Sequence, residues 1–570
     1  MTVKGTISRI NEAVKVKGEG VEQITYLRNK DIIPMGPERR IWGQFSYMFY
    51  WSITNVTIST WSGASSLLSN GLSVGETMGI IIIGNVIIAT LALLNAAPGG
   101  YYHIGYTISQ RVVFGIRGST IGIVIRIILS IVWFGSQAYL GSLCLSCIFS
   151  SWSSNYLNMK NTIPESVNMT TRDLVGFVIF QVISIPLLFL KPEKINKLLM
   201  VTCCATFFAM MGITIWAVTN NGGSNGPLMT TSSQMSSSAR GWYWVYGISS
   251  WYGSLSSGVA NQSDFTRFSR KTWSSFWGTI FSLIVIGTII PLMGLVTASA
   301  MKETYKEEFW LPNSIIIQWL ETNYSPKARA AAFFCGVSFT LSQLCFNTMG
   351  NGYAGGMDMA GILPKYITIK RGAVLTALLS WVVQPWDFYN TSSTFVTVMS
   401  SFSVFMSPIV AIITSDFWVI RRKKLKLSHL YVDDANGNYW YSAGWNYRSL
   451  IIWGISFAPG LPGLMNGANP SIKINSGIRN FYYGNCLFEF SIAFFLNCLS
   501  AYIWPYKNVE DVDNIDYFDS FTEEECKQRD MITYQQWKGT TNIDNVHIPE
   551  EGLLKELKDA SIISADDLSS

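Results

Sequence analysis

Four side chains within one apolar stretch are spaced so that they lie on the same face of a helix. In residues 125–141, IRIILSIVWFGSQAYLG, the residues Arg126, Ser130, Trp133 and Gln137 follow at intervals of four, three and four. Polar groups at bilayer depth are costly unless paired, so they usually face a bundle interior or a cavity. That face therefore needs a polar partner or a cargo. The structural alternative is that Gln137 bonds a neighbouring helix and Trp133 fills the core.

Arg126 also has two interpretations. Charged groups inside membrane helices are usually paired. We therefore expect the Arg126 guanidinium to neutralise a carboxylate or to bond backbone carbonyl groups, in preference to contacting a ligand directly.

The composition indicates a membrane protein. The 570 residues are 49% hydrophobic and only 14% charged, with a mean hydropathy of +0.26, whereas soluble domains carry about 25% charged residues. The net charge of +5 comes from short connections and tails, which predicts no nucleic-acid partner. Cys144 and Cys147 form a C-x-x-C pair with no histidine nearby, so we expect apolar packing there and no metal site.

Hydrophobic windows long enough to cross about 30 Å of lipid recur along the chain. They predict an all-α protein embedded in a lipid bilayer, with about twelve transmembrane helices at 45–68, 78–97, 120–149, 174–190, 198–219, 241–259, 276–300, 329–353, 372–386, 393–420, 449–464 and 485–504. The expected division is an N-terminal tail (1–43), a transmembrane domain (44–504) and an acidic, partly disordered C-terminal tail (505–570). Residues 313–322 are too few to cross and predict an interfacial helix or lid.

The distribution of basic residues predicts that both termini are cytoplasmic. Lys and Arg concentrate in alternate connections, as the positive-inside rule requires for cytoplasmic loops. These residues are Arg111, Arg117, Lys191, Lys194, Lys197, Arg267, Arg270, Lys271, Lys365, Lys370, Arg371 and Arg421 to Lys424.

Small polar residues interrupt the first predicted span. Asn55, Thr57, Ser59 and Thr60 lie in WSITNVTISTWSGASS, residues 51–66. A helix break there would free backbone groups for a ligand or ion and provide a gate. The alternative is an intact helix that packs through its hydroxyl groups.

The sixth and eighth spans are also unusual. The run GSLSSG at 253–258 predicts a break of span six around Ser256, and Asp264 beyond it is expected either at an inner gate with Arg267 or in an exposed turn. Asn347 and Asn351 lie four apart, on one face of span eight. Unusual residues in spans one, three, six and eight are typical of two inverted five-helix repeats around a midplane site.

Five stretches of the chain resemble one transporter family. They are NKDIIPMGPERRIWG before span one, GYYHIGYTISQRVVFGIRGS at 100–119, WFGSQ in span three, NQSDFTRF after span six and LPKYITIKRGA at 363–373. Together they resemble fungal members of the nucleobase-cation-symport-1 family, which includes uracil, allantoin, uridine, thiamine and nicotinamide riboside permeases. The resemblance implies a LeuT-like five-plus-five inverted repeat with broken helices 1 and 6, two extra helices and alternating access to a bound heterocycle.

The resemblance also implies a substrate site. Trp133 matches the family's stacking tryptophan, Gln137 the amide that bonds the heterocycle, Asn351 the ligand asparagine of span eight and Asn347 its companion. A second stacking tryptophan is expected from span six, but Trp251 does not lie at the expected distance from Asp264, and no replacement is named.

The coupling ion is expected to be a proton. In the family's sodium-coupled bacterial relative, span-eight hydroxyls hold the metal; the matching residues here are Ser342, Cys345 and Phe346, of which two are poor ligands for a hard cation. Spans one, three, six and eight show no carboxylate midway to carry a proton, and Glu489 lies in the last span, outside the repeats. The proton site therefore stays open.

The substrate class has two interpretations. WFGSQ and Asn351 resemble the uracil and allantoin group, whereas residues 57–61, 328–343 and 392–402 look at least as much like the thiamine and nicotinamide riboside group. The first interpretation is proton-coupled import of a neutral nitrogen heterocycle such as uracil or allantoin across the plasma membrane. The alternatives are a thiamine or nicotinamide riboside permease, or a nutrient sensor that does not transport. The spans show no nucleophile–base pair or metal-ligand cluster, so an enzyme is not expected.

Overall fold

The computed structural model describes residues 15–16, 25–190, 196–307 and 309–541 as helices joined by turns and short loops. Within these ranges, eight helical segments are long and apolar enough to cross a membrane. They are Val74–Tyr102, Ser119–Trp152, Glu165–Leu187, Leu198–Asn220, Phe276–Tyr305, Pro326–Ile362, Ser392–Ile420 and Asn485–Ile503. Each coincides with a predicted span, so the prediction of an all-helical membrane protein is confirmed.

The other four predicted spans are also helical, but they are interrupted, shorter or less apolar. Span one is divided into α2 (Gln44–Asn55) and α3 (Ile58–Ser66), and span six is α10 (Ser237–Ala260). Span nine is α17 (Ile369–Leu379) followed by the 3₁₀ turn η8 (Ser380–Val383). Span eleven is divided by proline-containing turn η12 (Ala458–Gly460) into α19 (Tyr447–Phe457) and α20 (Leu461–Ala468).

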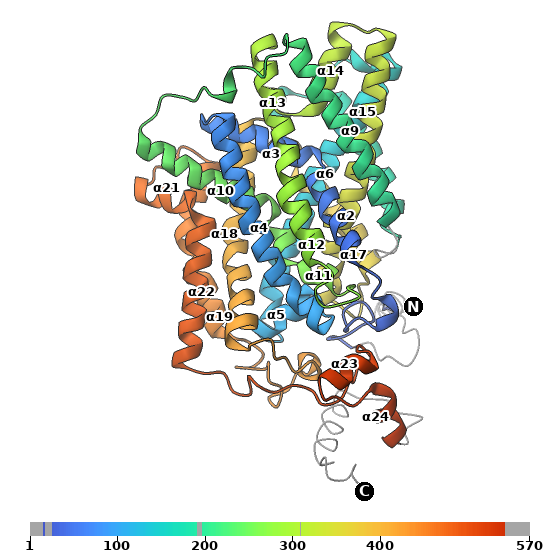
Figure 1. Ribbon diagram of the computed structural model, residues 1–570, viewed down its shortest axis with the longest axis vertical. Coiled ribbons are helices and arrows are strands. Elements are labelled where there is room, and N and C mark those ends of the chain that lie inside the picture. Colours follow the sequence, from blue (N-terminus) through green and yellow to red (C-terminus); the bar gives the residue numbers. More distant parts are fainter. Residues whose placement is uncertain (1–14, 17–24, 191–195, 308, 542–570) are drawn as a thin grey trace, which may run out of the picture.

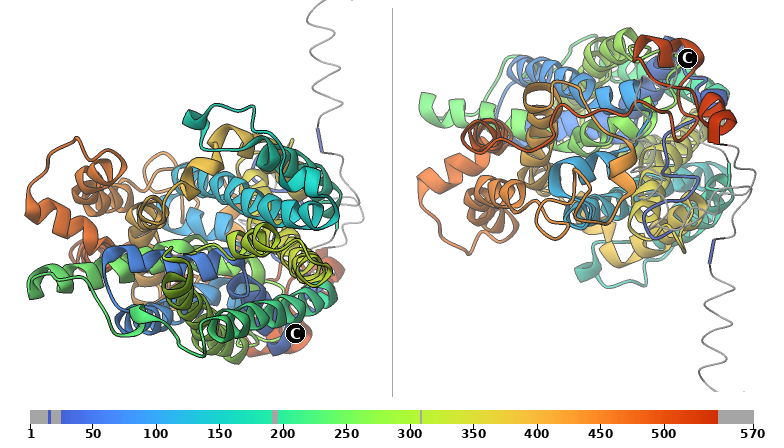
Figure 2. Two further views of the ribbon diagram at one scale, coloured as in Figure 1. Left: turned by 90° about the horizontal axis from the view of Figure 1, so that it is seen from above. Right: turned by 90° about the horizontal axis from the view of Figure 1, so that it is seen from below.

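The long helices run side by side along the length of the molecule (Figure 1). Around the middle of the bundle lie α4 (Val74–Tyr102), α6 (Ser119–Trp152) and α10, together with α18 (Ser392–Ser415). The C-terminal helices α19, α20, α21 (Ser476–Tyr483) and α22 (Asn485–Ile503) stand at one edge, with α22 packed on α18 (Figures 1 and 2). The chain therefore has a central bundle and a peripheral C-terminal group.

Span eight is longer than predicted and changes its winding. It begins as α15 (Pro326–Phe346), continues through the π-helical segment η7 (Asn347–Tyr353) and ends as α16 (Ala354–Ile362). The prediction stopped at residue 353 because the sequence becomes glycine-rich there. Those glycines are buried, and a Cβ on Gly356 would lie 2.3 Å from the Ile369 carbonyl oxygen, so they allow α17 to pack closely on α16.

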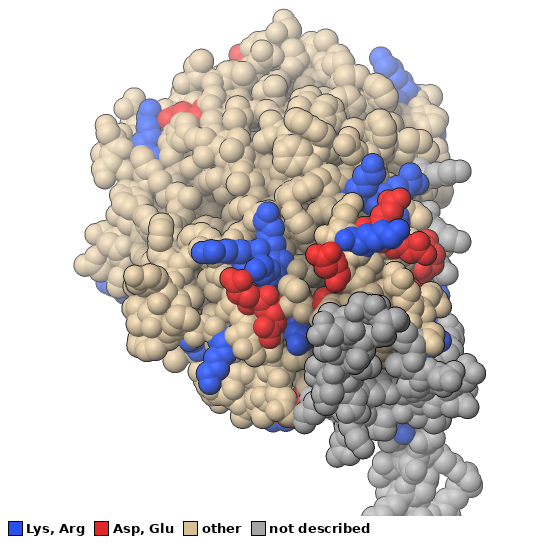
Figure 3. All heavy atoms as spheres, turned by 60° about the horizontal axis from the view of Figure 1, so that its bottom comes forward, with Lys and Arg blue, Asp and Glu red and all other residues tan. Residues whose placement is uncertain are grey.

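One end of the molecule, here called the tail face, is formed by residues 421–446, α23 (Glu523–Gln528) and α24 (Tyr534–Thr541). Lys, Arg, Asp and Glu gather around this end, whereas most of the rest of the visible surface carries no charge (Figure 3). The opposite end, the far face, carries α14 (Pro312–Thr322), which agrees with the helix predicted at 313–322 (Figure 1).

The C-terminal tail is more ordered than predicted up to residue 541; the rest of it lies outside the described residues. Ile515 and Ile532 form a parallel bridge, and the Asp513 carboxylate accepts a 3.0 Å hydrogen bond from the Ser428 N–H. The acidic side chains that suggested disorder are used as caps and ion pairs, for example in the capping box of Thr522 and Glu525.

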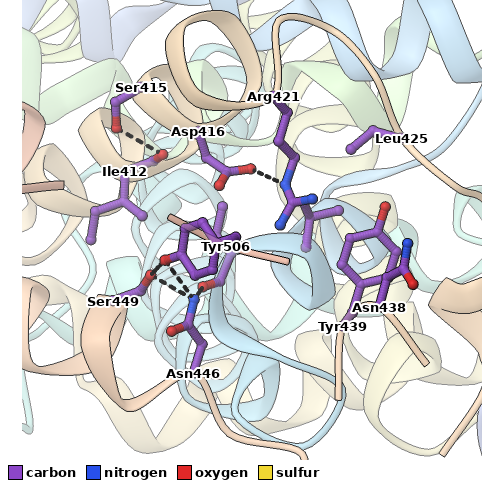
Figure 4. A network of polar contacts seen from close by, with 12 residues as sticks. Ile412, Ser415, Asp416, Arg421, Leu425, Asn438, Tyr439, Asn446, Ser449 and Tyr506 are labelled. Atoms are coloured by element: carbon purple, nitrogen blue, oxygen red, sulfur yellow. Dashed lines mark hydrogen bonds and ion pairs between the residues drawn. The ribbon is translucent and has the colours of Figure 1, made fainter. Parts of the chain in front are cut away.

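The tail-face end of α18 is fixed by a second polar network (Figure 4). Asp416 accepts a 2.9 Å hydrogen bond from Arg421 Nε, and Arg421 Nη2 donates to the Tyr441 hydroxyl at 2.8 Å. Asn446 and Ser449 meet the Tyr506 hydroxyl beside this pair. The loop that follows α18 is thereby held against the bundle.

Candidate binding cavity

A cavity of about 690 Å³, part of it open to solvent, lies between helices in the middle of the bundle. It is lined from α2, α3, α6, α10, α15, η7 and α18. The lining residues are Tyr50, Trp51, Thr54, Ser59, Thr60, Trp133, Gln137, Trp251, Ser254, Leu255, Ser257, Gly258, Phe346, Gly350, Asn351, Phe395 and Met399. Spans one, three, six and eight thus meet at one place, as the sequence predicts.

Aromatic rings form much of the cavity wall, and among the described residues no Asp, Glu, Lys, Arg or His side chain lines it. The rings belong to Tyr50, Trp51, Trp133, Trp251, Phe346 and Phe395. Trp133 is held from behind by Phe402, at 5.1 Å between ring centroids. A flat ligand would therefore find several π faces and no formal charge.

The polar groups of the cavity are amides and hydroxyls. Gln137 is fully buried, and neither its amide nitrogen nor its oxygen has a hydrogen-bond partner among the described residues. A buried amide without partners costs about 1–3 kcal/mol, which a ligand with a matching donor and acceptor would recover. The structural alternative for Gln137, a bond to a neighbouring helix, is therefore not what the structure shows.

The two asparagines of span eight have different positions. Asn351 lines the cavity and donates from Nδ2 to Asn347 Oδ1 at 2.9 Å. Asn347 does not line it; its Nδ2 donates to the Phe134 carbonyl at 3.1 Å. Both lie in the π-helical segment η7, and such segments are frequent at functional sites. Asn347 thus connects Asn351 to the backbone of α6.

The first span is broken at Val56 and Thr57, between α2 and α3. Thr57 caps α3 by accepting a 3.3 Å hydrogen bond from the Thr60 N–H, and the freed Val56 carbonyl accepts one from the Ser342 hydroxyl at 3.0 Å. Asn55 lies behind the break and donates to the Trp51 carbonyl at 2.9 Å. Ser59 and Thr60 line the cavity, so the break presents the start of α3 to it.

The break predicted in span six around Ser256 is wrong in position. α10 is helical through residues 253–258, and the interruption lies at Asn261, between α10 and the short helix α11 (Gln262–Thr266). Gly253 serves close packing, since a Cβ there would lie 2.0 Å from the Met399 carbonyl oxygen of α18. Ser256 donates to the Gly253 carbonyl at 2.9 Å and does not line the cavity.

A buried ion pair lies on the tail side of the cavity. Arg126 donates from Nη2 and Nε to Asp358 Oδ2 at 3.0 and 3.2 Å, and from Nη1 to the Ser257 carbonyl at 2.7 Å. The expectation that Arg126 neutralises a carboxylate is confirmed. Asp358 was missed because the predicted span ended five residues before it.

Asp264 lies near this ion pair and is buried, so the interpretation of an exposed turn is wrong. Its Oδ1 accepts a 2.8 Å hydrogen bond from the Tyr106 N–H, and it does not line the cavity. Arg267 donates to the Asp31 carbonyl at 2.7 Å. Segments before span one and after spans two and six are joined here.

Trp251 is the main cavity residue that sequence reasoning set aside. It lines the cavity, and its indole Nε1 donates to Asn85 Oδ1 at 2.9 Å. Trp251, Ser254, Leu255 and Gly258 follow at helical spacing along α10 and all line the cavity. This periodicity is present in the sequence, but the distance from Asp264 argued against Trp251 as the stacking residue.

The helical bundle and its aromatic and amide cavity are those of a membrane protein that binds a small flat molecule, and comparison with known proteins identifies the family. Residues 34–485 match the family described as permeases for cytosine and purines, uracil, thiamine and allantoin. The chain belongs to this family, also called nucleobase-cation-symport-1, which confirms the resemblance seen in the sequence and excludes an enzyme.

Three curated relatives from Saccharomyces cerevisiae show where in the family the chain lies. It is 42% identical to a thiamine transporter over 93% of this chain and 88% of the relative, and 41% identical to nicotinamide riboside transporter 1 over 94% and 89%. Identity to the uracil permease is 31%, over 84% and 77%.

The solved structure of Mhp1, a nucleobase-cation-symport-1 family transporter in a closed conformation with bromovinylhydantoin, has the same fold. Its TM-score is 0.67 at 19% identity, over 89% of this chain and all of that one. The fold is therefore LeuT-like, as predicted.

Proposed function

We propose that this chain is a secondary active transporter that imports thiamine, nicotinamide riboside or a similar heterocycle across the plasma membrane together with protons. In this proposal the chain crosses the membrane twelve times as two inverted repeats plus two helices, and the tail face is cytoplasmic. The relatives favour this substrate class over the uracil and allantoin class that the sequence first indicated, since the thiamine and nicotinamide riboside transporters are 42% and 41% identical to this chain and the uracil and allantoin permeases 31% and 30%.

The aromatic wall of the cavity supports a cationic ring as substrate. Thiamine contains a thiazolium ring and nicotinamide riboside a pyridinium ring, whereas uracil and allantoin are neutral. Cations are attracted to the faces of aromatic rings, most strongly to tryptophan, and more so when water is excluded. Trp51, Trp133 and Trp251 offer such faces, and no basic side chain lines the cavity to repel the charge.

The unpartnered amide of Gln137 is the observation that carries the proposal. It can accept from an amino group and donate to an adjacent acceptor. The aminopyrimidine of thiamine and the carboxamide of nicotinamide riboside both present that pair of groups. Gln137, with Asn351 beside it, would hydrogen-bond this polar end of the substrate, while the aromatic side chains of the cavity wall contact the cationic end.

Proton coupling is supported by the first helix break. The Val56 carbonyl that the break frees is already bonded by the Ser342 hydroxyl, and Cys345 and Phe346 occupy the other two positions expected to face a sodium ion. A hard cation prefers several oxygen ligands, which this set does not supply.

The proposal is tested by measuring uptake at two external pH values in cells that lack their own permeases. The labelled substrates are thiamine, nicotinamide riboside, uracil and allantoin. We expect saturable uptake of one of the first two, faster at acid pH. Gln137→Ala should lower uptake about tenfold or more at unchanged surface abundance, because one to three kcal/mol of hydrogen bonding is lost.

Gln181→Ala is the matched control, since that buried amide bonds Ser380 outside the cavity. It should keep uptake near wild type. Saturable uracil or allantoin uptake alone would overturn the substrate assignment. Ligand binding to the purified protein without any uptake would overturn transport in favour of a sensor.

A further inference from the structure

Glu489 is a buried carboxyl group that the cavity does not use. It lies in α22, fully buried, and neither of its oxygens has a hydrogen-bond partner among the described residues. An isolated carboxylate is far too costly in such surroundings, so the group must hold a proton in this conformation. Ionisable groups inside membrane segments usually mark proton or ion pathways.

The surroundings of Glu489 are built to accommodate this group. It faces the turn η12 that divides span eleven, and a Cβ on Gly460 would lie 2.2 Å from Glu489 Oε1 and 3.3 Å from Val404 Cγ1. With glycine at this position the carboxyl group lies directly against the backbone of the turn, and a larger residue would displace it. Interrupted helices in transporters commonly line ion or substrate sites.

The other titratable groups close to Glu489 are neutral at physiological pH. They are the Cys486 thiol of α22, the Tyr252 hydroxyl of α10 and, further toward the far face, the Tyr482 hydroxyl of α21. The described residues of α18, α19 and α20 bring no charge near it, since Asp416 and Arg448 lie at the tail-face ends of their segments. No fixed charge therefore compensates the ionised form.

Polar side chains lead from Glu489 toward the far face. Ser407 lies beside both Cys486 and Tyr252, and one turn further Asn485 bonds Ser403 and, at 3.2 Å, the Ser400 hydroxyl. Toward the tail face the next buried α22 side chain is Ala493, opposite apolar residues of α18, and polar contact resumes only where Asn497 donates to Ser415 at 2.9 Å. In this conformation polar side chains therefore lie on the far-face side of Glu489, and apolar side chains lie on its tail-face side.

The same two helices carry this cluster and the substrate cavity. Trp251 of α10 lines the cavity and the next residue, Tyr252, joins the cluster; on α18, Met399 lines the cavity and Ser407 joins the cluster. A movement of α10 or α18 during transport would change both sites together.

We infer that Glu489 is the residue that carries the coupled proton. A proton from the far side binds a Glu489 oxygen, and the same proton leaves toward the tail side once α10 and α18 have moved. The inference rests on the proposed transport function and assigns its missing proton site.

The first test uses purified protein in liposomes, with labelled thiamine or nicotinamide riboside outside and a pH lower by one unit outside. With the membrane potential held at zero by equal potassium concentrations and a potassium ionophore, one proton per cationic substrate would support up to about tenfold accumulation, because one pH unit is worth about 1.36 kcal/mol. Glu489→Gln should lower the accumulation ratio to about one, while exchange of labelled for unlabelled substrate continues. Glu489→Asp should restore part of the pH dependence, and the exposed Glu524→Gln should behave as wild type. Accumulation retained by both Glu489→Gln and Glu489→Ala would overturn the inference.

The second test does not depend on transport. The infrared spectrum of wild-type protein at neutral pH should show a protonated carboxylic acid band that Glu489→Gln lacks and Glu524→Gln keeps. An unchanged band in Glu489→Gln would overturn the inference. If the wild type carries neither substrate, the proposed function fails, and this spectrum still decides whether Glu489 holds the proton.

Discussion

The guanidinium of Arg126 and the carboxylate of Asp358 are 1% and 0% exposed, so each depends on the other for its charge to be tolerated. A buried pair contributes little net stability when compared with apolar residues, but removing one partner leaves an uncompensated charge. The pair joins span three to the end of span eight, just behind the cavity. This makes it a structural requirement of the site and not a ligand for the substrate.

We therefore expect Arg126→Ala to destabilise the protein by about 3–5 kcal/mol and to lower the yield of folded, monodisperse protein. Adding Asp358→Ala should recover much of this loss, because no charge then remains unpaired. Arg240→Ala is the control, since the two side chains of its 3.6 Å ion pair with Glu76 are 40% and 20% exposed, and it should cost at most about 1 kcal/mol. Thermal unfolding of the purified variants in detergent measures the order of their stabilities. A double variant worse than Arg126→Ala would contradict the explanation.

The two asparagines of span eight should differ in how they affect substrate affinity. Asn351→Ala removes a cavity amide, so we expect substrate affinity to fall by about tenfold or more. Asn347→Ala removes the support that orients Asn351 and should cause a smaller loss of affinity. Isothermal titration with the transported substrate measures both. Equal affinity of Asn351→Ala and wild type would remove this residue from the site.

At the scale of secondary-structure elements, helices α10 and α18 approach so closely that a glycine is needed between them. Gly253→Ala places a Cβ 2.0 Å from a backbone oxygen of α18. We expect it to force the helices apart and to lower both the unfolding temperature and uptake. Gly241→Ala on the same helix has nothing within 4 Å of the new Cβ, and should be neutral or stabilise by up to about 1 kcal/mol. Equal effects of the two substitutions would show that this approach is not a constraint.

The elements were largely predictable from the sequence because lipid imposes long apolar windows. The breaks were only partly predictable. The polar residues around Thr57 mark a real interruption, yet the glycine and serine run at 253–258 looks equally breakable and is a continuous helix. Small residues serve close packing and helix breaks alike, and only the neighbouring helix decides between them.

The site was predictable where residue types were unusual for a membrane span. Gln137 and Asn351 stand out in apolar surroundings and do line the cavity, while Asn347 stands out equally and lies behind it. Aromatic residues such as Phe346 and Phe395 carry no such signal, since they are common in any core. Asp358 was hidden because the predicted end of span eight depended on a glycine-rich stretch that the fold buries.

At the scale of the whole molecule, the C-terminal tail packs at the tail face on segments from the N-terminal part of the chain. Arg40, just before span one, donates two 2.9 Å hydrogen bonds to the Glu525 carboxylate of α23, and Arg529 donates to the Tyr101 carbonyl at 2.6 Å and lies over the Phe521 ring. The tail thus packs on the start of span one and the end of span two. Both segments continue into the bundle that holds the cavity.

Loss of the Glu525 carboxylate should release this tail, whereas mild acid should not. Burial would raise the pKa of Glu525, but hydrogen bonds from the Arg40 guanidinium and from the Thr522 N–H hold it well below its usual range. Its contribution to docking is therefore present above the usual Glu pKa of about 4.3 and is lost only as the pH falls through the lowered value. We expect Glu525→Ala to speed proteolysis of the tail about fivefold, a modest effect because the carboxylate is partly exposed. The tail of the wild-type protein should be cleaved at the same rate at pH 7 and pH 5.5, after correction for the activity of the protease at each pH. Glu524→Ala, exposed on the same helix, should cleave as wild type does; release of the wild-type tail at pH 5.5 would show that another group controls docking.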